Sequence, residues 1–189
     1  MSVKTLAIAV PLLTASLAAQ AQTIETQDPH LQSVLDSILG GCLDDAEAVR
    51  TAHERFYDPD RPLAGAAAPD LGAAIAEALA VPPETVTAEP AGPQSEIGAV
   101  TVATQGTYQS LPVVSYSFSL PCECGFSFWA IGFDAPEEEV KRLFAGALET
   151  ARKRVSEVLE NESDGLEIGV ERNDQAPGAA TQLYCAWST

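Results

Sequence analysis

Residues 114–133 read VSYSFSLPCECGFSFWAIGF, and this stretch decides the fold. In its first part, from Val114 to Leu120, apolar residues alternate with serines, and this period of two predicts a half-buried β-strand. The second part, Phe126 to Phe133, is apolar on both faces, which predicts a strand in the middle of a sheet. Because only a short turn separates the two strands, we expect them to form an antiparallel hairpin.

Three more strands are predicted on either side of this hairpin. The same period of two marks each of them: Val100 and Val102 upstream, then Leu166, Ile168 and Val170, and finally Leu183, Cys185 and Trp187. Together with the hairpin, they make a sheet of five mainly antiparallel strands.

The longest predicted helix follows the hairpin. Its apolar residues recur at helical spacing from Val140 to Leu159 and form one face. Asp134 and Glu137, on either side of Pro136, have the spacing of a capping box at the helix start. We expect this helix to cover one face of the sheet.

The N-terminal part is also predicted to be helical. Asp28 and Pro29 are typical of a helix start, and an apolar stripe that includes Cys42 continues to Phe56. This pattern predicts one amphipathic helix, or two in line, with a weak point at Gly40-Gly41. This helical segment should lie beside the long helix or close one end of the sheet.

Residues 59–95 hold seven of the thirteen prolines and predict mostly irregular chain. Within them, Asp70 is expected to cap a short helix, and Thr85–Gln94 is expected to be an exposed linker. The predicted fold class is therefore α+β: a two-layer sandwich of the five-stranded sheet and one long helix, with an N-terminal helical segment. We expect residues 22–189 to form a single domain, because a chain of that length buries a core of its own.

Residues 1–21 have the features of a cleaved signal peptide. Lys4 precedes an uncharged apolar stretch, Thr5 to Ala19, that is too short to cross a bilayer. The stretch ends in Ala19-Gln20-Ala21, the pattern that signal peptidase cleaves. We therefore expect export to the periplasm and no membrane insertion after cleavage.

The strong negative charge limits the choice of partner. Ten Lys and Arg residues face 27 Asp and Glu residues, a formal net charge of −17, and loss of Lys4 with the signal peptide makes it −18. Such a surface repels phosphates, which argues against nucleic acid and anionic lipid. It favours solubility and faster association with a basic periplasmic or envelope protein. The oligomeric state is left open.

Four cysteines, Cys42, Cys122, Cys124 and Cys185, form an even set that predicts disulfides in an oxidising compartment. Three pairings are possible. Because a Cys122–Cys124 bond would close a very small ring, we expect one bond from this turn to Cys42 and another to Cys185. A redox or metal role for the turn is the alternative reading.

We predict no catalytic residue, no cofactor and no metal. Two histidines and one methionine offer few further ligands for zinc or copper. His53 falls on the apolar stripe, where a core histidine bonded to a carbonyl is expected. Residues 160–171 come close to a calcium loop, but they begin with Glu and no helix follows. The cations of the long helix, Lys141, Arg142 and residues 152–154, should be balanced by its own glutamates.

These features favour an exported binding or inhibitor-type protein, immunity-like in role and without catalytic activity. An acidic surface speeds association with basic enzymes such as wall-degrading hydrolases. One alternative is an accessory subunit of an envelope complex that docks through Trp129, Trp187 or the first helix. Another is a small periplasmic enzyme that uses the Cys122/Cys124 turn or paired carboxylates.

Overall fold

The computed structural model describes residues 23–61, 63, 66–90, 98–121, 125–158, 165–173 and 179–188. Its architecture is α+β, as predicted. The helical elements are α1 (Pro29–Leu39), α2 (Glu47–Phe56), α3 (Ala68–Leu79), the 3-10 turn η1 (Pro83–Thr85) and α4 (Glu137–Val158). The strands are β1 (Glu25–Thr26), β2 (Val86–Glu89), β3 (Ala99–Tyr108), β4 (Leu111–Ser119), β5 (Phe126–Phe133), β6 (Glu167–Arg172) and β7 (Thr181–Ser188).

All strand pairs in the described part of the sheet are antiparallel, and the order is β1-β3-β4-β5-β7-β6 with β2 also paired to β3. The predicted hairpin is confirmed as β4 and β5, and β5 is central because β4 and β7 flank it. Its apolar character on both faces follows from this position.

The sheet has two more strands than the five predicted. β1 pairs with β3 at Thr26 and Gly106, and β2 pairs with β3 from Val86 opposite Val102 to Glu89 opposite Ala99. The predicted linker over Thr85–Gln94 is therefore wrong at β2. A strand this short has too few residues to show a period, so its pairing with β3 defines it.

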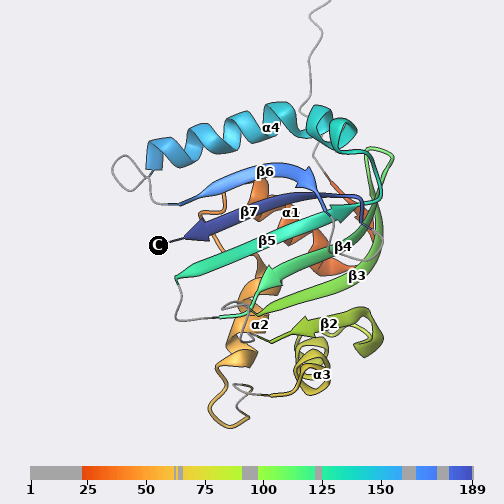
Figure 1. Ribbon diagram of the computed structural model, residues 1–189, viewed down its shortest axis with the longest axis vertical. Coiled ribbons are helices and arrows are strands. Elements are labelled where there is room, and N and C mark those ends of the chain that lie inside the picture. The colour runs from red at the N-terminus through yellow and green to blue at the C-terminus, as the bar shows by residue number, and fades with distance from the viewer. Residues whose placement is uncertain are drawn as a thin grey trace, which may run out of the picture.

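α1, α2 and α4 form a layer on one face of the sheet (Figure 1). α1 packs against β5 and β7 and lies beside α4, while α4 runs along β6 and β7. This arrangement confirms that the N-terminal helical segment lies beside the long helix. α3 packs against β2 and α2, nearer the other edge of the sheet.

The core lies between these two layers. Side chains at matching register positions of β3, β4, β5 and β7 are buried in one row: Val102, Tyr116, Ile131 and Leu183. From the helical layer, Phe144 of α4 places its ring centroid 4.9 Å from Tyr108 and 5.6 Å from Phe133. Contacts between aromatic rings at this spacing add to the free energy gained by burying them.

The weak point predicted at Gly40-Gly41 is confirmed as a break between two helices, because the chain turns at Gly40 and reaches positive φ at Gly41 and Cys42. Two helix starts differ from the prediction. The short helix α3 begins after Ala67, so Asp70 lies in its first turn and does not cap it. α4 begins at Glu137, and the backbone N–H groups of Glu139 and Val140 donate to the Pro136 carbonyl. The residue before the helix is therefore Pro136, two residues after Asp134, which was predicted to cap it.

A disulfide joins Cys42 to Cys185 and so ties the end of α1 to β7. The preferred pairing, in which Cys42 and Cys185 each bond to the 122–124 turn, is therefore wrong. Both side chains lie inside the core, at 5% and 0% exposure, and their Cα atoms are 6.5 Å apart. The sequence did place Cys42 on a buried helix face and Cys185 on the inward side of the last strand, and both positions are confirmed. Cys122 and Cys124 lie outside the described residues.

Candidate binding groove

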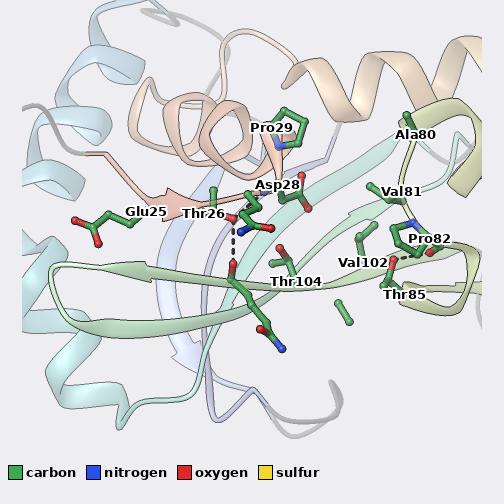
Figure 2. A pocket seen from close by; sticks show the side chains of 13 residues that line it. Glu25, Thr26, Asp28, Pro29, Ala80, Val81, Pro82, Thr85, Val102 and Thr104 are labelled. Atoms are coloured by element: carbon green, nitrogen blue, oxygen red, sulfur yellow. Dashed lines mark hydrogen bonds between the residues drawn. The ribbon is translucent and has the colours of Figure 1, made fainter.

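A groove of about 880 Å³ opens beside β3, at the edge of the sheet. Figure 2 shows the start of α1 on one side, the end of α3 with η1 on the other, and β3 crossing between them. Three segments line it: Glu25–Pro29, then Ala80–Pro82 with Thr85, and Val102–Gln105. They are distant in the sequence, and the sheet brings them together.

The floor of the groove is an interruption in the pairing of β3. β1 pairs with this edge as far as Gly106 and β2 begins to pair with it at Val102. Between them, Ala103, Thr104 and Gln105 have no strand partner on this edge among the described residues. The register with β4 also shifts between Ala103 and Gly106, which marks a β-bulge at the same place.

Hydrogen bonds fix the wall formed by the start of α1. The Thr26 hydroxyl donates to the Gln105 carbonyl at 3.0 Å and accepts from the Asp28 backbone N–H at 3.0 Å. Asp28 caps α1 by accepting from the His30 N–H at 2.9 Å. The predicted helix start at Asp28 and Pro29 is thus confirmed, and it holds the Asp28 carboxylate at the groove.

The opposite wall is the C-terminal end of α3. Ala80 ends the helix in the left-handed conformation, with φ +54°, and the Val81 N–H then donates to the Ala76 carbonyl. The His30 ring bridges the two walls, because its Nε2 lies 2.8 Å from the Leu79 carbonyl oxygen. Beyond them, the Thr85 hydroxyl donates to the Pro82 carbonyl at 2.7 Å. Hydrogen bonds within the chain therefore fix both walls of the groove before any ligand binds.

The charge of the groove is negative. Its acidic lining residues are Glu25 and Asp28, and none of the described lining residues is Lys, Arg or His. The C-terminal end of a helix carries partial negative charge, and the last turn of α3 contains no basic residue of its own. Both effects favour a cation in this groove.

A buried tyrosine lies next to the groove. Tyr116 is paired in register with Val102, which lines the groove, and its hydroxyl has no hydrogen-bond partner among the described residues. Burial, and then the negative charge of Asp28, raise the pKa of Tyr116 above its ordinary value. The Tyr116 hydroxyl therefore stays protonated, and part of the rise in its pKa comes from the negative charge of Asp28 at the groove.

Other residues considered in the sequence are structural or lie outside the described part. His53 places Nε2 3.0 Å from the Ser119 carbonyl oxygen, as expected of a core histidine. The residue Trp129 is buried at 3% exposure beside Cys185 on the neighbouring strand, so it offers no docking surface. Trp187 is half-buried. The predicted signal peptide, residues 1–21, and the start of the 160–171 segment lie outside the described residues.

The cations of α4 are mostly engaged, as predicted. Lys141 lies 2.6 Å from Glu137, and Arg142 and Lys153 lie 4.0 Å and 3.9 Å from glutamates one turn away. Arg152 donates through its guanidinium to the Ile168 carbonyl on β6.

The described residues contain no group of three or more His, Cys, Asp and Glu side chains that is arranged to hold a metal ion. Within the same part of the chain, every helix is too short or too polar to cross a membrane. No protein-family model matches the chain, and no curated protein and no solved structure shows significant similarity to it.

Proposed function

We propose that the protein is an exported binding or inhibitor-type protein that holds a basic periplasmic or envelope protein in the groove beside β3. The observation that carries the proposal is the groove's charge. Glu25, Asp28 and the end of α3 contribute negative charge, and no described lining residue is basic. A cationic side chain would be attracted there, and the net charge of −17, or −18 once Lys4 is removed with the signal peptide, would speed the encounter.

The disulfide supports the same reading. Cys42–Cys185 is a buried crosslink, which suits a protein that works in an oxidising compartment. The two fixed walls of the groove reduce the ordering that binding requires, and this favours a recognition role. No catalytic residue is assigned in this proposal, and no cofactor is required.

The test is affinity capture from an envelope extract, with the oxidised protein, residues 22–189, immobilised. Two charge-matched double variants are compared with the wild type. Glu25→Gln with Asp28→Asn removes the two groove carboxylates, and asparagine at position 28 still caps α1. Glu149→Gln with Glu157→Gln removes two charges from α4, which packs at the opposite edge of the sheet.

A basic protein recovered near stoichiometry by the wild type and by the α4 double variant, but lost from the groove double variant, supports the proposal. If both double variants retain the partner equally, the partner binds elsewhere on the protein or is held only by the overall negative charge. A partner that is a membrane complex would favour the accessory-subunit alternative.

A further inference from the structure

We infer that the partner enters the groove as an added β-strand, an extended segment that pairs with β3 between β1 and β2 and carries a cationic side chain at its centre. This inference rests on the proposed function and specifies how the partner's chain is held. It selects an extended peptide over a small cationic molecule, because a strand edge recognises backbone.

The geometry of the edge sets the length and direction of the segment. β1 and β2 are both antiparallel to β3, so they run in the same direction along one edge. Between the pairs Thr26–Gly106 and Val86–Val102, only Ala103, Thr104 and Gln105 lack a strand partner among the described residues. At about 3.4 Å per residue, this gap accepts roughly three extended residues. A segment limited by strands at both ends has to enter and leave sideways, which suits an extended loop.

The backbone of β3 is open to such pairing. Unpaired N–H and C=O groups at a strand edge are a template for another strand. The Gln105 carbonyl already accepts from the Thr26 hydroxyl, whereas Ala103 and Thr104 have no strand partner on this edge among the described residues. Since successive residues of a strand direct their N–H and C=O groups to opposite edges, one of these two residues offers its groups to the partner. Edge strands are commonly protected by lysines, and the described lining of this gap contains no basic residue.

The side-chain pattern follows from the pleat. All three residues of the gap line the groove, but Thr104 is half-buried whereas Ala103 and Gln105 are exposed. In an antiparallel pair, the residue opposite Thr104 shares its face and so points into the groove. There it meets the Asp28 carboxylate and the carbonyl end of α3. We therefore assign the central position of the segment to Lys or Arg.

The probe is a capped peptide with one central lysine, Gly-Ser-Val-Lys-Val-Ser-Gly, titrated into the wild-type protein and followed by backbone amide NMR. Three comparison ligands separate the possibilities: the same peptide with glutamate at the centre, the peptide with N-methylated backbone at the central residues, and a polyamine. Hydrogen exchange of the amides at residues 103–105 is measured with and without saturating peptide.

We expect the lysine peptide to bind and the amides at residues 103–105 to exchange more slowly when it is bound. N-methylation should weaken binding about tenfold, since it removes backbone donors. The glutamate peptide should not bind. Glu25→Gln with Asp28→Asn should weaken binding about five- to tenfold, and the α4 double variant should leave it unchanged.

Strand insertion is wrong if the N-methylated peptide binds as well as the parent, if the amides at 103–105 are not protected, or if the lysine peptide fails to bind. It is also wrong if a polyamine shifts the same amides as strongly as the peptide. In each case, a partner that is still lost from the groove double variant leaves the proposed function standing. Only retention of the partner by that variant overturns both.

Discussion

Cys42 and Cys185 are bonded to each other although 143 positions separate them in the sequence. Cys42 follows α1 and Cys185 lies on β7, so the bond joins the helical layer to the sheet. It lies inside the core, where both side chains are buried.

Replacing both cysteines with alanine should lower the free energy of unfolding by about 5 kcal/mol in the chain-entropy model, because the bond closes a very long loop in the unfolded chain. The measurement is urea unfolding of the oxidised wild type and of the double variant. A non-reducing peptide digest of the wild type should contain a fragment pair linked through Cys42 and Cys185. A digest that instead links either of them to the 122–124 turn would disprove the pairing.

Tyr116→Phe should leave the free energy of unfolding unchanged or raise it by about 1 kcal/mol. The Tyr116 hydroxyl is buried without a hydrogen-bond partner among the described residues, so removing it relieves an unsatisfied group. Tyr184→Phe is the matched control, because the Tyr184 hydroxyl donates to Glu167 and its loss should destabilise by about 1 kcal/mol. A loss above about 1 kcal/mol in Tyr116→Phe would reveal a partner for that hydroxyl.

Stability should fall in alkaline solution. Burial raises the pKa of both Tyr116 and Tyr184, and at Tyr184 the hydrogen bond and the charge of Glu167 raise it further. The folded protein therefore holds these protons more tightly than the unfolded chain, whose tyrosines titrate near pH 10.0. Their contribution is fully present below that pH and is lost as the pH rises toward the folded pKa values.

The check is the free energy of unfolding measured from about pH 9 to about pH 12. The double variant Tyr116→Phe with Tyr184→Phe should decline less steeply than the wild type over this interval, because lysines titrate in both proteins alike. Parallel curves for the two proteins would show that neither tyrosine contributes.

Ala80→Gly should stabilise the protein by about 0.5–1 kcal/mol. Ala80 ends α3 at φ +54° and ψ 38°, a conformation that glycine adopts without steric cost. Ala73→Gly, in the exposed interior of the same helix, should instead destabilise by about 1 kcal/mol. Thermal unfolding of both variants and the wild type should show a higher melting temperature for Ala80→Gly and a lower one for Ala73→Gly. A destabilised Ala80→Gly protein would contradict the left-handed conformation at the end of α3.

Periodicity was sufficient to predict the longer elements. The alternation from Val114 to Leu120 and the apolar run in β5 gave the hairpin, and the helical face of α4 was placed correctly over most of its length. Its far end differs: Val158 belongs to the predicted apolar face but is 60% exposed. A period records which residues share a face of a helix, but it does not record where the sheet beneath that face ends.

The groove could not be predicted in the same way. Its residues belong to three short segments without a shared motif, and the gap at Ala103–Gln105 exists only because β1 and β2 stop short of each other. Neither strand is long enough to show a period. The disulfide illustrates a related limit, since inward-facing positions for Cys42 and Cys185 did not by themselves decide between the possible pairings.

The position of β7 has a consequence for how the chain reaches its native state. β7 is the last strand in sequence, yet it lies between β5 and β6 and carries the cysteine that meets Cys42. A polypeptide that is synthesised from its N-terminus cannot complete this sheet until residues 181–188 have been made. Until then the edge of β5 that pairs with β7 stays open, and an open apolar strand edge is a site where chains aggregate.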